Sequence, residues 1–164
     1  MEKSLDYLWS SWRMEYIVGK STEDCVFCEV LKSPDGPDNL VVYRVKYSFV
    51  ILNRYPYTCG HLMVVPYTHQ PSLELLTPET RTELMELTTQ AIQILQKEYQ
   101  PQGFNVGINI GEAAGAGILG HVHLHIVPRW GGDTNFMSTL ANTRVLPENL
   151  SETYLRLKNG WIVQ

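Results

Sequence analysis

The sequence predicts an α+β fold with an antiparallel sheet of about five strands, one long helix and a short C-terminal helix. Two observations carry this prediction. Short segments rich in Val, Ile, Leu and aromatic residues follow one another with connections too short for helical crossovers, which favours antiparallel pairing. Only one long segment has helical periodicity. At 164 residues the chain is expected to form a single domain, residues 1–164, with residues 1–20 as an N-terminal arm.

Three strands are predicted directly after the turn sequence SPDGPD at 33–38. They are NLVVYR (39–44), YSFVILN (47–53) and GHLMVVP (60–66). Thr77 and Pro78 then mark a helix start, because Thr is a good N-cap and Pro suits the first helical position. Apolar residues recur at helical spacing behind them, so residues 78–99 are predicted to form one amphipathic helix whose apolar stripe faces the core.

Two more strands and one helix complete the pattern. From Phe104 to Ile110 apolar residues alternate with Asn and Gly, and HVHLHIVP at 121–128 alternates in the same way. This is the period of a half-buried strand. A glycine-rich loop joins the two segments. A short C-terminal helix is predicted within 148–158, where leucines and a tyrosine share one face.

Composition and charge argue against several classes of protein. Hydrophobic residues make up 44% of the chain and charged residues 18%, which fits a packed core better than a disordered chain. The formal net charge is −4 and no basic run is present, so we expect no binding of nucleic acid. The apolar segments are far shorter than the roughly 20 residues that cross a bilayer. The first residues also lack the pattern of a secretory signal. We therefore expect a cytoplasmic protein without membrane contacts.

The distribution of histidine predicts a functional site. His121, His123 and His125 alternate along a predicted strand, so their imidazoles share one face while the apolar residues between them share the other. Such a row could hold a metal ion, or one neutral ring could attack a phosphoryl group. Few carboxylates lie nearby in the sequence, and the glycine-rich loop offers backbone N–H groups to a phosphate, which favours the nucleophile. Three surface imidazoles without a joint role are the plain alternative.

Several segments of the chain resemble the histidine triad (HIT) superfamily of nucleotide hydrolases and transferases. GHVHLHIVPRW is similar to the defining motif, His-φ-His-φ-His-φ-φ with φ apolar, while NRYPYTCGHLMVVPYTH and NIGEAAGAG are similar to the segments that precede it. LWSSWRMEYI and PRWGGDTNFM resemble the branch of diadenosine-tetraphosphate phosphorylases, or ATP adenylyltransferases. The resemblance covers most of residues 8–137 and implies a HIT-like fold.

The resemblance also implies catalytic roles. His123 would attack the α-phosphorus of a nucleotide and form a nucleotidyl-histidine intermediate. His125 would donate a hydrogen bond to a phosphate oxygen on which charge builds in the transition state. His61, in the Gly-His pair, either braces the site or is a surface histidine at a strand end.

Four residues are implied as substrate-binding. Asn53 would contact the ribose, although it is also a typical strand-ending turn former. Asn109 and Gly117 would face the phosphates. Trp130 would close the site, although packing explains it equally well. Many superfamily members carry a polar pair before the triad that assists the leaving group, whereas Gly117 and Ile118 stand here. Assistance to the leaving group would therefore have to come from backbone amides or from another group.

Cys25 and Cys28 have the spacing of a zinc knuckle, which needs two further ligands. In superfamily members with this feature, and in the related galactose-1-phosphate uridylyltransferases, the further ligands correspond to His69 and His121 here. The resemblance therefore implies a structural zinc ion. A buried pair of thiols without metal is the alternative, and a redox role lacks the βαβ context that it needs. Cys59 has no predicted role.

The reaction favoured by the resemblance is phosphorolysis of diadenosine tetraphosphate or related dinucleoside polyphosphates, with inorganic phosphate as acceptor. Three alternatives remain at this point: a HIT-type hydrolase of nucleoside polyphosphates or phosphoramidates, a nucleotide-binding module with little turnover, and a zinc hydrolase that uses the triad as metal ligands. A homodimer is also implied by the resemblance.

Overall fold

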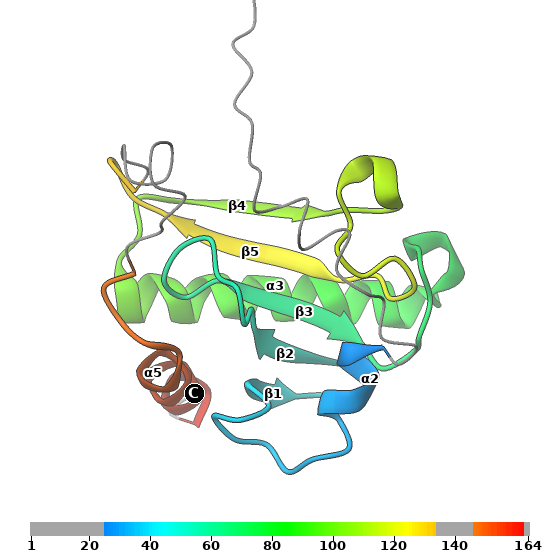
Figure 1. Ribbon diagram of the computed structural model, residues 1–164, viewed down its shortest axis with the longest axis horizontal. Coiled ribbons are helices and arrows are strands. Elements are labelled where there is room, and N and C mark those ends of the chain that lie inside the picture. The colour runs from blue at the N-terminus through cyan, green and yellow to red at the C-terminus, as the bar shows by residue number, and fades with distance from the viewer. Residues whose placement is uncertain (1–24, 134–145, 163–164) are drawn as a thin grey trace, which may run out of the picture.

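The computed structural model describes residues 25–133 and 146–162, so the predicted N-terminal arm (1–20) lies outside the described residues. Its centre is a five-stranded sheet in which every neighbouring pair is antiparallel, with the strand order β1-β2-β3-β5-β4 (Figure 1). The strands are β1 (Val41–Arg44), β2 (Ser48–Leu52), β3 (Leu62–Pro66), β4 (Gly103–Ile108) and β5 (Leu124–Arg129). The predicted α+β class with an antiparallel sheet is confirmed.

Helices cover one face of this sheet and flank its end. The described helices are α2 (Val26–Val30), α3 (Pro78–Tyr99) and α5 (Leu150–Ile162), with single 3-10 turns at Leu73–Leu75 and Glu112–Ala114. The long helix α3 crosses behind the sheet, and α5 packs against α3 and β1 (Figure 1). Helix α3 begins where predicted, because the Thr77 side chain accepts the N–H of Thr80 and Pro78 occupies the first helical position.

The C-terminal helix is longer than the predicted 148–158 because its buried side continues to its end. Trp161 stacks on Tyr43 of β1 with ring centroids 5.7 Å apart. A Cβ atom at Gly160 would lie 2.8 Å from the Ile94 Cγ2 of α3, so the close approach of the two helices requires glycine there. No helix within the described ranges is both long and apolar enough to cross a membrane.

The strand predicted over 121–128 is shorter in the structure, since β5 begins at Leu124. Before that residue the segment pairs with no strand, and the Val122 N–H donates instead to the carbonyl of Gln70 at 2.7 Å. His121 and His123 therefore lie in the connection that leads into β5, not within the sheet.

The segment predicted as a half-buried strand over 104–110 leaves the sheet after Ile108. Two of its apolar residues, Val106 and Ile110, are 44% and 42% exposed. β4 lies at the end of the described strand order, and α3 packs mainly on β2, β3 and β5, so this helix does not cover the apolar residues of β4.

The two faces of β5 have different surroundings. Leu124 and Ile126 belong to the hydrophobic core together with the apolar stripe of α3. Successive strand residues point to opposite faces, so His125 points away from α3. Its cross-strand neighbours are Met63 of β3 and Gly107 of β4. We call the face that carries His125 the site face.

Candidate active site and metal centre

The three triad histidines have different surroundings. His121 is fully buried and His123 is 4% exposed, whereas His125 is partly exposed. The ring centroids of His123 and His125 lie 4.8 Å apart, with the planes at 68°. Val122 and Leu124 between them are buried in the core. The triad is therefore not a uniform row of surface imidazoles.

The His123 ring is held in one tautomer. Its Nδ1 lies 2.9 Å from the backbone oxygen of His121, and a carbonyl oxygen can only accept, so Nδ1 carries the proton. Burial lowers the pKa of His123 and outweighs the opposite influence of that hydrogen bond, so the ring is neutral at neutral pH. Nε2 then keeps its lone pair, which is the form of imidazole that acts as a nucleophile.

His125 is set in the opposite tautomer through His61. The Tyr57 backbone N–H donates to His61 Nδ1 at 3.2 Å, so a neutral His61 carries its proton on Nε2. That atom lies 2.9 Å from His125 Nδ1, which must accept. His125 therefore presents an N–H at Nε2. The Tyr57 ring also packs on both imidazoles, with centroids 4.7 Å from His61 and 6.4 Å from His125. His61 thus braces the site, the first of the two interpretations given for it.

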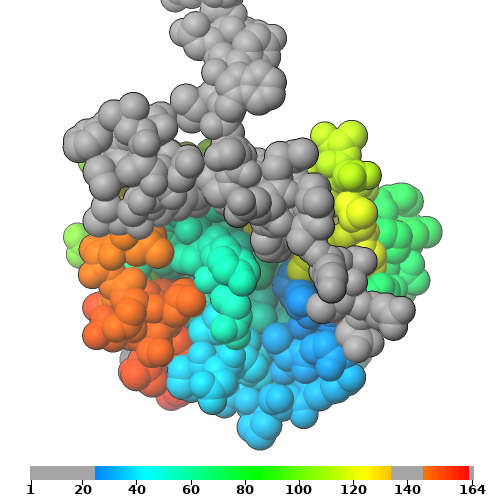
Figure 2. All heavy atoms as spheres, in the orientation of Figure 1, coloured from blue at the N-terminus to red at the C-terminus, as the bar shows by residue number. Residues whose placement is uncertain are grey.

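The loop that carries His61, residues 53–60, is tied to the rest of the fold. The Thr58 hydroxyl donates to the Pro128 carbonyl of β5 at 2.7 Å. Gly60 has φ 77°, and a Cβ there would lie 2.9 Å from a leucine of α3, so the turn comes too close to the helix for any larger residue. In Figure 2 this loop, in turquoise, stands in front of the sheet between α2 and α5.

Cys59 anchors the same loop to α5. Its sulfur lies 3.6 Å from both Glu148 Oε2 and Thr153 Oγ1. Glu148 also accepts from the Tyr99 hydroxyl at 2.5 Å and from Arg156 at 2.7 and 3.0 Å. Burial raises the pKa of the Cys59 thiol, so it is protonated and inert. Sequence reasoning identified neither Glu148 nor this network, and no local pattern marks it.

Cys25, Cys28, His69 and His121 form one cluster, with their ligand atoms all within 4.8 Å of one another. The sulfur of Cys25 lies 3.3 Å from His121 Nδ1, and that of Cys28 lies 3.4 Å from His69 Nδ1 and 3.8 Å from His121 Nδ1. Zinc bonds of about 2.3 Å to sulfur and 2.0–2.1 Å to nitrogen predict tetrahedral S···N distances of about 3.6 Å. The cluster therefore fits a tetrahedral metal ion.

The second nitrogen of His121 supports this fit. Nε2 lies 2.8 Å from the Pro66 carbonyl, so it carries the proton and leaves Nδ1 unprotonated toward the thiols. A metal-ligating histidine usually donates its other N–H to such a carbonyl. Burial lowers the pKa of His121 and so favours the neutral, ligating form. Among the described residues His123 and His125 are outside this cluster, so the triad is divided between two sites.

Asn53 directly follows β2, and Asn109 directly follows β4. The Asn53 backbone N–H donates to the His61 carbonyl at 2.9 Å, and its side chain accepts the N–H of Tyr55 at 2.9 Å. The side chain thus forms the strand-ending turn that was one interpretation of Asn53. The last paired residues of β4 and β5 are Ile108 and Leu124, and Asn109 and His123 each lie directly beyond that pair in their own segment.

Gly117 and Trp130 lie at opposite ends of β5. Gly117 is exposed, in the loop that joins β4 to the residues before β5. Trp130 follows the far end of β5, and seven residues of extended chain separate it from His123 by about 23 Å. Trp130 and His123 therefore lie beyond opposite ends of β5, and the role of Trp130 in closing the site stays a prediction.

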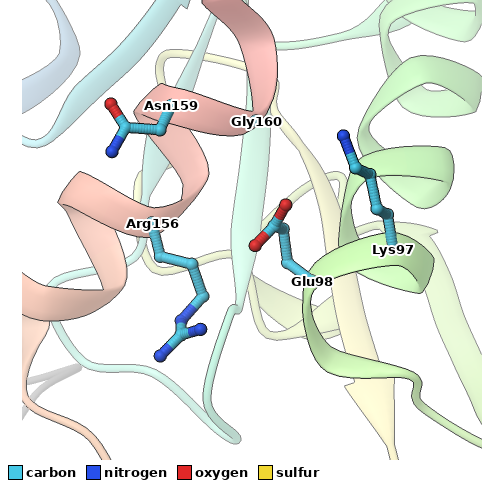
Figure 3. A pocket seen from close by; sticks show the side chains of 5 residues that line it. All are labelled: Lys97, Glu98, Arg156, Asn159 and Gly160. Carbon is cyan, nitrogen blue, oxygen red and sulfur yellow. The ribbon is translucent and has the colours of Figure 1, made fainter. Parts of the chain in front are cut away.

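A separate hollow of about 340 Å³ opens between α3 and α5. It is lined by Lys97, Glu98, Arg156, Asn159 and Gly160. Figure 3 shows the Glu98 carboxylate between the two helices, with Arg156 reaching in from α5 and Lys97 rising from α3. Because α3 packs on the face of the sheet opposite His125, this hollow is not part of the triad site.

The chain is similar in sequence to known proteins that process dinucleoside polyphosphates, as their names state. The family model "HIT domain" matches residues 36–132. "AP-4-A phosphorylase" of Mycobacterium tuberculosis is 39% identical over 169 residues, which cover 98% of this chain and 86% of that protein. The asymmetrical bis(5'-nucleosyl)-tetraphosphatase of Schizosaccharomyces pombe is 37% identical over 89 residues, 54% of this chain and 48% of that protein.

Solved structures agree with these relatives. The crystal structure of a Zn-bound histidine triad family protein from Mycobacterium smegmatis superposes with a TM-score of 0.68 at 28% identity. The match covers 87% of this chain and 96% of that one. The divided triad, the sheet and the matched sequence lead to the same conclusion: this chain belongs to the HIT (histidine triad) domain family.

Proposed function

We propose that this chain is a nucleotidyltransferase that acts on dinucleoside polyphosphates through a covalent intermediate on His123 and passes the nucleotidyl group to inorganic phosphate. The observation that carries the proposal is the pairing of two adjacent imidazoles in complementary forms. His123 keeps a lone pair on Nε2, and His125 presents an N–H at the same position. The names of the relatives, a phosphorylase and a tetraphosphatase of such compounds, support the substrate class.

With diadenosine tetraphosphate the chemistry balances in two steps. The His123 Nε2 lone pair attacks one α-phosphorus, and the bond from that phosphorus to the bridging oxygen breaks, releasing ATP. His125 stabilises the charge that builds on a non-bridging oxygen by donating its N–H. A phosphate oxygen then attacks the adenylyl-histidine and forms ADP, which restores the neutral ring.

Substrate binding is proposed for the polar residues that surround the triad. Asn53 would contact the ribose, and Asn109 with the loop of Gly117 would contact the phosphates. Because the formal net charge is −4, phosphate affinity has to come from backbone N–H groups and imidazoles close to the site, not from a basic surface.

The four-ligand cluster is proposed to hold a structural zinc ion on Cys25, Cys28, His69 and His121. A closed four-ligand site leaves no open position for substrate, so the ion would stabilise the fold without touching the nucleotide. The division of the triad between two sites also argues against a hydrolase that uses all three histidines as ligands of one metal.

The dependence on phosphate tests the reaction. Full-length protein is incubated with diadenosine tetraphosphate, with and without inorganic phosphate, and the nucleotides are separated by chromatography. Phosphorolysis gives ATP and ADP and requires phosphate. Equal rates without phosphate, with ATP and AMP as products, would instead establish the hydrolase. Absence of turnover with tight nucleotide binding would establish the binding module.

A homodimer is proposed through the β4 edge. Val106 is exposed on β4, whose outer edge pairs with no other strand among the described residues, and a second copy added antiparallel would pair with the backbone of this edge. In such an arrangement about three strand spacings, or about 14 Å, would separate Trp130 from the partner's His123, less than the distance within one chain. Light scattering on the Val106→Lys variant tests this, since the variant should be monomeric while the unmodified protein is dimeric.

A further inference from the structure

Helix α2 links the metal cluster to the nucleophile. Cys25 directly precedes this five-residue helix, Cys28 lies within it, and Phe27 between them is 2% exposed. The Phe27 ring lies edge-on to His121, with centroids 5.4 Å apart and planes at 80°. It also packs against the His123 ring, with centroids 4.9 Å apart and planes at 57°. The turn that supplies two metal ligands therefore places an aromatic ring against the catalytic imidazole.

A second connection runs through the backbone of His121. The imidazole of this residue faces both thiols of the cluster, at 3.3 and 3.8 Å. Its carbonyl oxygen accepts the Nδ1 proton of His123. The same residue therefore contributes a ligand to the metal cluster and sets the tautomer of the nucleophile.

We propose that the metal knuckle is a positioning device for His123: metal bound by Cys25, Cys28, His69 and His121 holds Phe27 and the His121 carbonyl where they fix the plane and the tautomer of the His123 ring. Phe27 is a positioning residue in this scheme and does not touch the reacting atoms. The inference rests on the proposed role of His123 and adds a dependence of its orientation on the metal.

The short length of α2 explains why its position would depend on the metal. A helix of five residues is far below the roughly 12–15 residues at which an isolated helix becomes marginally stable, so α2 depends on external contacts. Metal binding to ligands brought from three parts of the chain is itself folding free energy. Removing the metal therefore frees α2 first, and with α2 the ring that packs on His123.

The direct test is nuclear magnetic resonance of full-length protein with ¹⁵N-labelled histidine at one fixed pH, with zinc and after removal of zinc by a chelator. The His123 signals are assigned from their loss in the His123→Asn variant. We expect the zinc-loaded protein to show the separate nitrogen shifts of a single Nδ1–H tautomer. The zinc-free protein should show averaged and broadened shifts, which zinc alone restores. Identical His123 signals in both states would overturn the proposal.

A matched pair of variants separates positioning from general stability. Phe27→Leu removes the ring that touches His123, whereas Phe49→Leu makes the same change at a fully buried ring that stacks on Tyr67. Phe27→Leu should lower kcat by about two- to tenfold at unchanged KM, the scale of one lost aromatic pair, and should broaden the His123 signals even with zinc bound. Phe49→Leu should lower the melting temperature but leave the His123 signals and kcat unchanged.

The outcomes also distinguish this inference from the proposed function. If His123 is not the nucleophile, the effect of Phe27→Leu on kcat vanishes, but the response of the His123 signals to zinc remains. Equal effects of the two variants on the His123 signals would reduce Phe27 to a core residue and overturn the inference. So would a rise in KM at unchanged kcat, which would place Phe27 in nucleotide binding.

Discussion

Replacing His61 by leucine tests the bracing of His125 without touching the substrate. The substitution removes the donor to His125 Nδ1 and leaves the Tyr57 N–H without its acceptor. A polar group that loses its partner costs about 1–3 kcal/mol when it is buried, and both of these hydrogen bonds are partly buried. If the cost falls on the orientation of His125 in the transition state, kcat drops by about 5- to 150-fold, because 1.36 kcal/mol corresponds to about a factor of ten.

The assay is turnover of diadenosine tetraphosphate at saturating phosphate, with kcat and KM measured separately. KM should stay close to the unmodified value, since His61 is fully buried. His61→Gln is the matched control, because its amide nitrogen can occupy the position of Nε2 and donate to His125. We expect His61→Gln to recover most of kcat. A His61→Leu variant that melts like the unmodified protein and keeps its full kcat would refute the bracing of His125.

Further predictions concern the supports of the site. Tyr99→Phe removes a hydrogen bond to the Glu148 carboxylate, which should cost about 1.5–3 kcal/mol and lower the melting temperature by about 3–12 °C in a thermal scan. Burial raises the pKa of Glu148, but its hydrogen bonds outweigh burial and hold the pKa below the usual value, so chemical denaturation should show stability lost below about pH 4, and Glu148→Gln should lack this loss. Gly160→Ala places a Cβ 2.8 Å from Ile94 and should cost about 1–3 kcal/mol in urea denaturation, whereas an unchanged midpoint would contradict the close packing of α3 and α5. Cys28→Ser should abolish zinc binding, as measured by elemental analysis, and lower the melting temperature.

The elements that the sequence predicted well are those set by local rules. The start of α3 depends on Thr77 and Pro78, which are adjacent to each other, and the helix begins where they indicate. The antiparallel sheet follows from short connections, which leave no room for helical crossovers. The alternation of His and apolar residues correctly placed Val122 and Leu124 in the hydrophobic core, although His121 and His123 are buried as well.

The differences arise where position in the whole fold decides. Val106 has the pattern of a half-buried strand, yet it is exposed because β4 lies at the end of the strand order, beyond the strands on which α3 mainly packs. The 121–128 segment alternates like a strand, but His121 turns to the metal cluster before pairing begins at Leu124. Alternation in the sequence indicates which face of a strand a residue points to, but it does not indicate whether another part of the fold covers that face.

The supports of the site were the hardest to predict because they join distant parts of the chain. His61 and His125 are separated by 64 residues, and Cys59 and Glu148 by 89. No residue type or spacing near Glu148 distinguishes it from an exposed acid at a helix start. The cysteine spacing alone does not identify the two histidine ligands of the metal cluster. The family resemblance was therefore needed to predict His69 and His121 together with Cys25 and Cys28.

A mass spectrum of the protein during turnover detects a covalent intermediate on His123 directly. Full-length protein is mixed with diadenosine tetraphosphate without phosphate and quenched in alkali, since a phosphoramidate bond is labile to acid. We expect an increase in mass of one adenylyl group on the peptide that contains His123, and this adduct should disappear when phosphate is added and ADP forms. Turnover at full rate in the His123→Asn variant, or an adduct on a different residue, would contradict the role of His123 as the nucleophile.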